Sequence, residues 1–359
     1  MTPTSLSLQF LTLGVAVATT VFVAWAWPRV RRARWFIRPV LLTLCALTAF
    51  SVVGVAVNRI MFLAPTWGHV LGDRNAAAVP VAGDDAGGSV PTAAPGQSRM
   101  EQFTPAAGKS GIALPVIVYL PPGYDQSETV RYPVITAYAG FPGTPNTWVS
   151  GTGAQKMLDA EIAAHRMAPT IVIYPTIHPD PKWDSECVNA EGGPQFETYL
   201  TEDVPNAVKS RFRVRGDRSA WGVIGFSTGG YCAVNHVMRH PDIYAAAVSL
   251  SGYFKPLPGG QGGTQDLFKG NEKARQENAP LWRIQNLPVP DVDIWFGAAR
   301  DDKNAMAGIT EFAPHVKAPI RFTTAFIPSG GHTLAAWMVL IPSALDWLSA
   351  RLAAPQTLS

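Results

Sequence analysis

The chain has 359 residues, of which 47% are hydrophobic and 15% are charged, and its formal net charge at pH 7 is +3. Six arginines fall within the first 63 residues, which contain no Asp or Glu. The rest of the chain therefore has 23 basic and 26 acidic residues. Because the basic excess is confined to the N-terminus, the composition argues against a nucleic-acid-binding protein, and the high apolar content argues against a disordered chain.

Two long apolar segments open the chain. Leu6 to Trp27 contains no charged residue, and Pro39 to Val57 repeats the pattern. Each is close to the ~20 residues that a helix needs to cross a bilayer. The N-terminus also lacks the basic stretch that begins a signal peptide. We therefore predict a transmembrane hairpin over residues 1–63, with spans at about 6–27 and 39–60.

The loop between the two segments is strongly basic. Its sequence, PRVRRARWFIR, carries five of the six arginines. Short cytoplasmic loops of membrane proteins are enriched in Lys and Arg. We therefore expect this loop in the cytoplasm and everything after about Leu63 on the extracytoplasmic side of the plasma membrane, in a multi-pass arrangement.

A linker and one large domain follow. Residues 64–110 are rich in Ala, Gly, Pro and Ser, which is typical of a flexible linker. Residues 111–355 alternate short β-branched runs with helical patterns, which predicts an α/β fold with a mostly parallel sheet and helices on both faces. The expected strands are 115–120, 133–138, 170–175, 219–225, 244–250, 292–297 and 320–327. The expected helices are about 152–165, 197–211, 228–239, 304–316 and 332–352.

The sequence Gly-Phe-Ser-Thr-Gly-Gly at 225–230 follows one expected strand and opens one expected helix. A Gly-x-Ser-x-Gly turn in this context is typical of the nucleophile elbow of serine hydrolases, with Ser227 as the nucleophile. Taken alone, the pattern also fits a glycine-rich turn with an idle serine.

A base and an acid follow in the chain order that such hydrolases use. His332 comes directly after Gly330 and Gly331, between the last expected strand and the last expected helix. The acid that fixes the tautomer of this histidine is expected just past the strand VDIWFG, where two aspartates are adjacent. We favour Asp302 as the acid, with Asp301 as the alternative.

Stabilising the tetrahedral oxygen of an acyl-transfer reaction needs two backbone N–H groups. Thr228, the residue after the nucleophile, is expected to supply one of them. Phe141, in the loop AGFPG (139–143), is expected to supply the other, because Pro142 has no N–H. A plain Gly/Pro turn is the alternative interpretation of this loop.

The cysteines and histidines give two further expectations. Cys187 and Cys232 both lie in the part predicted to face outward, where an oxidising environment permits a disulfide, so we hypothesise a bond between them, with two free thiols as the alternative. His236 and His240 have the spacing of a zinc-binding helix, but Val237 stands where that motif requires Glu. We therefore expect no metal and no cofactor.

The chain from about Ile117 to Leu348 resembles the esterase family of α/β-hydrolases, which includes esterase D, feruloyl esterases and the antigen 85 mycolyltransferases. The matching stretches are VYLPPGYD (118–125), RYPVITAYAG (131–140), GFSTGGYCA (225–233), RHPDIYAAAVSLSGYF (239–254) and GGHTLAAWMVLIPSALDWL (330–348). The resemblance implies an α/β-hydrolase fold and the roles assigned above to these residues: Ser227, His332, Asp302 or Asp301, Phe141 and Thr228. The chain departs from the family at Ala139-Gly140, where many members carry His-Gly or Asp-Gly.

The substrate is where the sequence is least informative. Tyr253 and Phe254, at the start of a long segment before the acid strand, and Trp148 are candidates to line a substrate pocket or to pack in the protein. A membrane tether favours an ester of a lipid or of the cell envelope. We therefore expect a membrane-anchored serine hydrolase of carboxylic esters. The alternatives are acyl transfer to a sugar or lipid hydroxyl, hydrolysis of aminoacylated lipids, and an inactive scaffold; the oligomeric state is left open.

Overall fold

The computed structural model describes residues 5–30, 34–61, 82–83, 96–180, 182–258 and 266–357. The chain divides into two compact units, Met1–Ala78 and Val79–Ser359. Most of the predicted linker lies outside the described residues, which include only 82–83 between residues 62 and 95.

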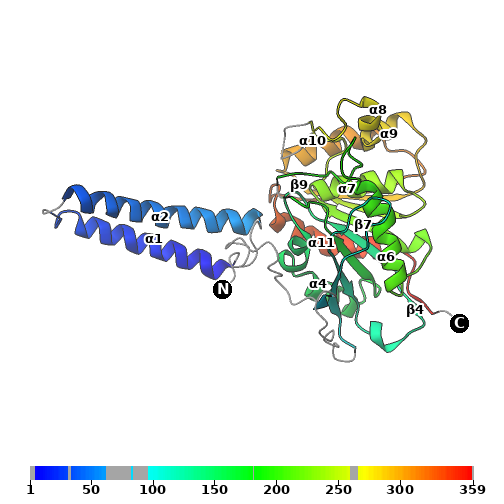
Figure 1. Cartoon of the computed structure of the whole chain (residues 1–359), viewed down its shortest axis with the longest axis horizontal. Coiled ribbons are helices and arrows are strands. Elements are labelled where there is room, and N and C mark those ends of the chain that lie inside the picture. The colour runs from blue at the N-terminus through cyan, green and yellow to red at the C-terminus, as the bar shows by residue number, and fades with distance from the viewer. Residues whose placement is uncertain are drawn as a thin grey trace. The chain divides into compact units, whose positions relative to one another are not determined.

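The first unit contains two helices, α1 (Leu6–Ala26) and α2 (Arg34–Met61), which lie side by side (Figure 1). They run antiparallel: the Gln9 side chain near the start of α1 donates to the Val52 carbonyl in the second half of α2, at 3.3 Å. The chain therefore forms a helical hairpin within this unit.

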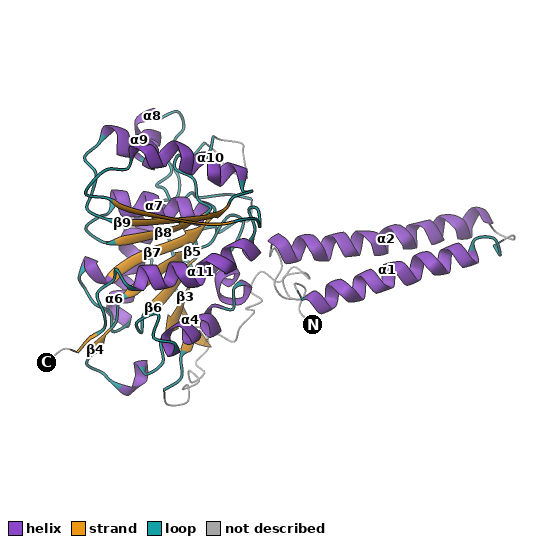
Figure 2. Cartoon of the chain, turned by 180° about the vertical axis from the view of Figure 1, so that it is seen from behind, coloured by secondary structure: helices purple, strands orange, loops and turns teal. Residues whose placement is uncertain are grey.

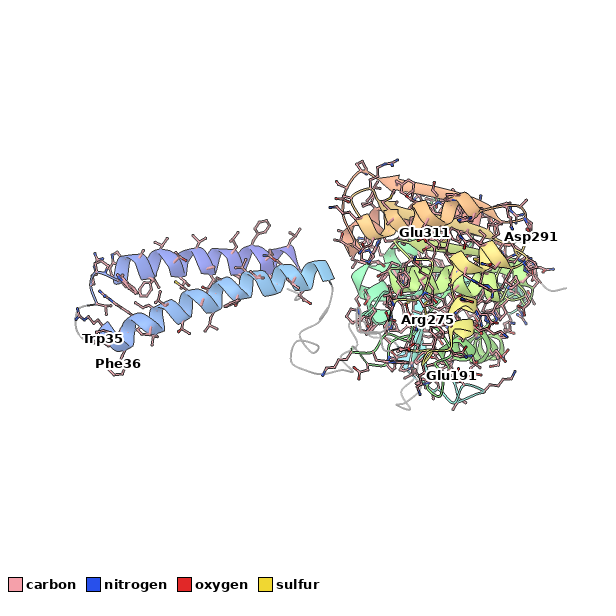
Figure 3. The ribbon with its side chains drawn as sticks, turned by 90° about the horizontal axis from the view of Figure 1, so that it is seen from above. Trp35, Phe36, Glu191, Arg275, Asp291 and Glu311 are labelled. Atoms are coloured by element: carbon pink, nitrogen blue, oxygen red, sulfur yellow. A yellow bond between two sulfur atoms is a disulfide. The ribbon has the colours of Figure 1, made fainter. Side chains whose placement is uncertain are left out.

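Apolar side chains project outward from both helices of the hairpin. Trp35 and Phe36, at the start of α2, are 79% and 80% exposed (Figure 3). By length and composition both helices could cross a membrane. The two expected spans are thus present as helices.

The second unit is built on a nine-stranded sheet with the order β1-β2-β3-β6-β5-β7-β8-β9-β10. From β6 to β10 in this order the neighbouring strands are parallel, whereas β3 is antiparallel to both β2 and β6. A separate antiparallel pair joins β4 and β11. The strands are β1 (Ala82–Gly83), β2 (Arg99–Phe103), β3 (Val116–Leu120), β4 (Val130–Arg131), β5 (Val134–Tyr138), β6 (Ile171–Pro175), β7 (Trp221–Phe226), β8 (Ala246–Leu250), β9 (Asp293–Ala299), β10 (Arg321–Ile327) and β11 (Gln356–Thr357).

Helices cover both faces of this sheet (Figure 2). α11 packs on β8 and β9 and touches α4, while α7 packs against β5, β7 and β8. The helices are α4 (Ala154–Ala163), α5 (Phe196–Thr198), α6 (Val204–Arg211), α7 (Thr228–Arg239), α8 (Glu272–Glu277), α9 (Pro280–Asn286), α10 (Lys303–Phe312) and α11 (Leu334–Ser349). Every residue of the five central strands β5 to β9 is buried, which explains why these strands are continuous apolar runs rather than alternating ones.

The seven strands expected from the sequence are all present, and so are the five helices. The structure adds β2 to the sheet, although residues 99–103 fall within the range predicted as linker. The strand RMEQF carries two charged residues, and its apolar Met100 and Phe103 are too few to make a recognisable run. The long segment after β8 likewise contains two short helices, α8 and α9, that the sequence pattern did not indicate.

Candidate active site

The predicted site residues follow the carboxyl ends of parallel strands. Ser227 directly follows β7, Asp301 and Asp302 follow β9, His332 follows β10, and Phe141 follows β5. The carboxyl ends of parallel strands meet at one edge of a sheet, which is where α/β proteins carry their sites. The topology therefore brings these segments to the same edge.

Ser227 lies in a strained turn, with φ 55° and ψ −123°, a conformation that non-glycine residues rarely adopt. Two backbone hydrogen bonds hold it: its N–H donates to the Leu250 carbonyl at 2.8 Å, and its carbonyl accepts from the Tyr231 amide at 3.1 Å. The flanking glycines leave the necessary room, because a Cβ at Gly225 would lie 2.1 Å from the Gly229 carbonyl oxygen. The turn is thus fixed around the serine.

A continuous chain of hydrogen bonds joins Ser227, His332 and Asp302. Nε2 of His332 lies 2.9 Å from Oγ of Ser227, and Nδ1 lies 2.8 Å from Oδ2 of Asp302. With the proton on Nδ1, the imidazole donates to the carboxylate and its Nε2 accepts from the serine hydroxyl. This arrangement can move a proton from the serine to the imidazole.

The carboxylate of Asp302 is buried, whereas the imidazole of His332 is accessible: their side chains are 3% and 44% exposed. Asp302 also caps α10, since its Oδ1 accepts from the Ala305 amide at 3.2 Å. Burial raises the pKa of Asp302, but the hydrogen bond and charge of His332 and the Ala305 amide outweigh burial and lower the pKa below its ordinary value. A negative charge is therefore fixed beside Nδ1.

Asp301 contacts the loop before His332 and not its ring. Its Oδ1 accepts from the Gly331 amide at 2.8 Å and its Oδ2 from the Gly330 amide at 3.2 Å. These two amides lower the pKa of Asp301 below its ordinary value. Of the two adjacent aspartates, the structure places Asp302 against the imidazole and Asp301 against the backbone that carries it.

Trp337 supports the imidazole from the side. Its ring meets the His332 ring edge-on, with the centroids 5.1 Å apart, and stacks on the Phe226 ring at 4.7 Å. Because Phe226 is the last residue of β7, Trp337 connects the histidine loop to the strand that leads into Ser227. The Gly-Gly-His-x4-Trp spacing of the sequence thus has a packing reason.

The loop after β5 lies against Ser227. A Cβ at Gly140 would lie 2.9 Å from the Cβ of Ser227, so a larger residue would collide with the serine. Phe141 follows in this loop, and its peptide bond to Pro142 is cis. Thr228 is the first residue of α7, and the first amides of a helix have no partner within it. The two predicted oxyanion donors therefore lie on the two segments that flank Ser227.

The three aromatic residues predicted as substrate candidates differ in their surroundings. Trp148 and Phe254 are 2% and 3% exposed. Trp148 donates to the backbone carbonyl at the end of β5, and Phe254 stacks on Phe312 at 4.1 Å, so both have the contacts of core residues. Tyr253 is half-buried, and its hydroxyl lies 3.4 Å from Oγ1 of Thr228, which places it beside the site.

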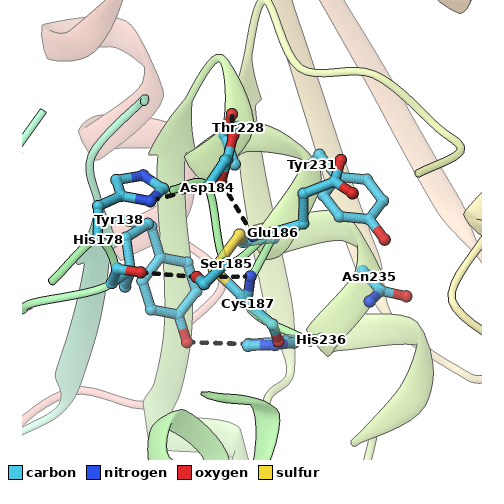
Figure 4. The surroundings of a disulfide bond; sticks show 12 residues. Tyr138, His178, Asp184, Ser185, Glu186, Cys187, Thr228, Tyr231, Asn235 and His236 are labelled. Carbon is cyan, nitrogen blue, oxygen red and sulfur yellow. Dashed lines mark hydrogen bonds and ion pairs between the residues drawn. A yellow bond between two sulfur atoms is a disulfide. The ribbon is translucent and has the colours of Figure 1, made fainter. Parts of the chain in front are cut away.

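The structure joins Cys187 to Cys232 in a disulfide, with the Cα atoms 5.7 Å apart (Figure 4). Cys232 lies on α7 and Cys187 in the loop after β6, so the bond fastens this loop to the helix that begins after Ser227. His236 is buried on the same helix, with Nδ1 3.0 Å from the Tyr138 hydroxyl and Nε2 3.0 Å from the Cys187 carbonyl. Both of its ring nitrogens therefore have partners within the protein.

Two buried residues beside the site were absent from the predicted set. His178 and Asp184 lie in the loop after β6, and Asp184 accepts a hydrogen bond from the Thr228 hydroxyl at 2.9 Å. The loop has no apolar periodicity and no motif, and its partner lies 44 residues further along the chain. A single sequence therefore holds no signal for this contact.

Residues 110–348 match the model of a family described as "Putative esterase". An uncharacterized protein of Corynebacterium glutamicum is 29% identical to the chain over 240 residues, which cover 65% of this chain and 56% of that protein. The match therefore spans little more than half the length of this curated relative.

Solved structures share the fold of the second unit. A ferulic acid esterase superposes with a TM-score of 0.62 at 20% sequence identity, covering 72% of this chain and 99% of that one. An S-formylglutathione hydrolase from Agrobacterium tumefaciens gives 0.61 at 16% identity, covering 72% and 97%. At these identities the likeness concerns the fold, which is the α/β-hydrolase fold expected from the sequence.

Proposed function

Because the chain belongs to the esterase family, as the match over residues 110–348 shows, we propose that it is a serine hydrolase of carboxylic esters. The observation that carries this proposal is the hydrogen-bonded chain from Asp302 through His332 to Ser227. A serine hydroxyl is a weak nucleophile unless an adjacent base takes its proton, and the base needs a partner that fixes its tautomer. Those three groups are in contact here.

The proposed reaction has two halves. In the first, Oγ of Ser227 attacks the ester carbonyl while Nε2 of His332 takes the hydroxyl proton, and the tetrahedral oxygen is held by the amides of Phe141 and Thr228. The imidazolium, stabilised by Asp302, then gives its proton to the leaving alcohol, and an acyl-enzyme is left. In the second half, water loses a proton to His332 and attacks the acyl group, and the proton returns to Ser227 as the acid departs.

We propose a lipid or cell-envelope ester as the substrate. Met338 and Val339 on α11 are 44% and 64% exposed, and α11 begins two residues after His332. They are the large apolar side chains that are most exposed among the described residues of the second unit. Exposed apolar side chains on the helix that begins after the accessible imidazole suit an acyl chain, and the two N-terminal helices would hold the enzyme at a membrane.

We further propose that the second unit lies outside the cytoplasm. The five arginines between the two apolar helices favour the cytoplasmic side for that loop, and the Cys187–Cys232 disulfide suits an oxidising compartment. External protease added to spheroplasts should then digest the second unit. Protection of this unit until the membrane is permeabilised would contradict the proposed orientation.

The activity is tested by labelling the full-length protein in detergent with a fluorophosphonate probe. We expect labelling of the wild type, none of Ser227→Ala, and strongly slowed labelling of His332→Ala. Ser210→Ala, which removes an exposed hydroxyl on α6 that contacts only the Ala207 carbonyl among the described residues, serves as the matched control. Equal labelling of wild type and Ser227→Ala would overturn the proposal and leave a scaffold role.

Analysis of the reaction products identifies the acyl group and the molecule that accepts it. Lipid profiling of a strain that lacks the gene should show an ester that accumulates, and the purified enzyme should release a free acid from it. An acylated sugar or lipid in place of the free acid would make the enzyme an acyltransferase, which uses the same residues. Accumulation of an aminoacylated lipid would identify that class of substrate.

A further inference from the structure

The loop after β6 places two ionisable side chains in the protein interior behind the nucleophile. His178 and Asp184 are 4% and 1% exposed. Figure 4 shows Asp184 between His178 and Thr228. Burying such groups is costly unless they have polar partners. The proton transfers proposed above do not use either residue, so their burial needs another reason.

Asp184 is in contact with one of the two proposed oxyanion donors. Its Oδ2 accepts from the Thr228 hydroxyl at 2.9 Å, and its Oδ1 accepts from the Glu186 amide at 2.9 Å. Nδ1 of His178 lies 3.4 Å from the same Oδ1. Thr228 itself is 3% exposed, so its hydroxyl bond to Asp184 is shielded from water. The carboxylate therefore ties the first residue of α7 to the loop after β6.

His178 is in contact with the other proposed donor segment. Its ring meets the Phe141 ring edge-on, with the centroids 5.2 Å apart and the planes at 83°. Burial lowers the pKa of His178, while the charge of Asp184 and the Ala139 backbone oppose this effect. His178 and Asp184 together thus span the distance between the loop after β5 and the start of α7.

The loop that carries this pair is itself held firmly. The disulfide connects Cys187 to Cys232, four residues after Thr228 on the same helix. Glu186 and Cys187 both have positive φ values, 44° and 53°, which non-glycine residues adopt only where the surroundings enforce them. The Ser185 hydroxyl adds a bond of 2.6 Å to a backbone carbonyl at the start of the loop. The pair therefore sits on a rigid support.

We propose that Asp184 and His178 are positioning residues that hold the Thr228 and Phe141 amides in the geometry that the tetrahedral oxygen requires. An oxyanion hole stabilises the transition state because its donors are already in place and need no reorganisation during the reaction. Two amides on separate loops can keep a fixed separation only if something connects the loops. The inference rests on the proposed function, because it assigns the pair to the same reaction.

Thr228→Val tests the link without removing the amide. Valine has nearly the shape of threonine, so the variant loses the hydroxyl bond to Asp184 and keeps the backbone N–H. Removing an entire oxyanion donor costs about 10²–10³ in kcat, so we expect loosening one donor to lower kcat about tenfold, with KM nearly unchanged. Thr201→Val is the matched control. Thr201 is also 3% exposed, and its hydroxyl makes a 2.8 Å hydrogen bond to the Glu197 carbonyl, which is not part of the site.

The measurements use the full-length protein with a short-chain p-nitrophenyl ester. Affinity for a boronic acid that forms a tetrahedral adduct on Ser227 should fall by the same factor as kcat, because only the tetrahedral state uses the hole. Thr228→Ser, which restores the hydroxyl, should recover most of the lost rate. Asp184→Ala, which removes the acceptor, should also lower kcat, and its effect should not add to that of Thr228→Val, since both variants lose the bond between these two side chains.

The outcomes separate the two proposals. If the wild type shows no Ser227-dependent turnover, the proposed function fails. Suppose instead that the wild type turns over and that the melting temperature shows Thr228→Val to be folded. If this variant then keeps the wild-type kcat and boronate affinity, only the positioning role is wrong. The positioning role is also wrong if Thr228→Val loses kcat and Thr228→Ser does not recover it. Should the valine variant fail to fold, Asp184→Ala with the boronate measurement carries the same test.

Discussion

Replacing each of the two adjacent aspartates by asparagine should give very unequal losses of activity. In Asp302→Asn the partner of Nδ1 loses its charge, and the amide favours the histidine tautomer whose Nε2 can no longer accept the serine proton. For a buried group 2.8 Å from Nδ1, we expect kcat to fall by about 10³–10⁴. This factor corresponds to about 4–5 kcal/mol of lost transition-state stabilisation.

Asp301→Asn acts only through the loop that carries the histidine. Asparagine keeps one oxygen that can accept from the Gly331 amide, and loses the acceptor for the Gly330 amide. The site around Asp301 is exposed, so water can replace the missing partner. We therefore expect kcat to fall by about tenfold or less, because the change displaces the loop that carries the histidine but removes no catalytic group.

The assay measures kcat and KM of both variants with a p-nitrophenyl ester, beside the rate of fluorophosphonate labelling. Melting temperatures establish that both variants are folded. Asp302→Asn should lose labelling rate and kcat together, because both depend on activation of Ser227. Equal losses in the two variants, or a larger loss in Asp301→Asn, would refute the assignment of the acid.

Three further changes test other parts of the structure. Gly140→Ala, whose Cβ would lie 2.9 Å from that of the nucleophile, should lower kcat/KM by about 10², whereas Gly216→Ala, with open space around it, should not. Replacing Cys187 and Cys232 by alanine should cost about 4 kcal/mol in urea unfolding, from the loop-closure entropy of a 45-residue separation. Burial and the charge of a neighbouring aspartate raise the pKa of Glu186 from 4.5 to about 8, so this group costs the wild type stability as pH rises through that range. The melting temperature of Glu186→Gln should therefore rise relative to that of the wild type between pH 5 and pH 8.5. A difference in melting temperature that does not change with pH would contradict the assigned protonation.

Much of the sheet was predictable because its strands are buried on both faces. A strand such as VIVYL (116–120) has five buried residues and appears in the sequence as an uninterrupted apolar run. The strand at 99–103 lies at the second position of the sheet and pairs with only a two-residue strand on its outer side, so that charged residues are tolerated and the run is lost. Its antiparallel pairing with β3 joins residues 13 to 21 positions apart in the chain, from Phe103 with Val116 to Arg99 with Leu120, and no local pattern indicates it.

The candidate nucleophile and base were predictable for a different reason, namely that strain and close packing require particular residues nearby. Ser227 needs glycines beside it because of its positive φ, and His332 is recognisable from the glycines before it and the tryptophan after it. His178 and Asp184 have no such requirement. Their neighbours in sequence can be of many kinds, and their role depends on contacts with segments that lie far away along the chain.

The adjacent aspartates show where this limit falls within a single motif. Both follow β9, both are acidic, and both contact the segment 330–332, some 30 residues downstream. What separates them is direction: Asp302 is turned inward as the cap of α10 and reaches the imidazole, whereas Asp301 stays at the surface and binds the backbone. A helix cap is a local feature, because Asp at the position before a helix is favoured for its bond to an amide three residues on. The helix expected at about 304–316 starts one residue later than α10, so its predicted boundary puts neither aspartate at the cap. The observed start at Lys303 gives the cap to Asp302, and a start one residue earlier would have given it to Asp301.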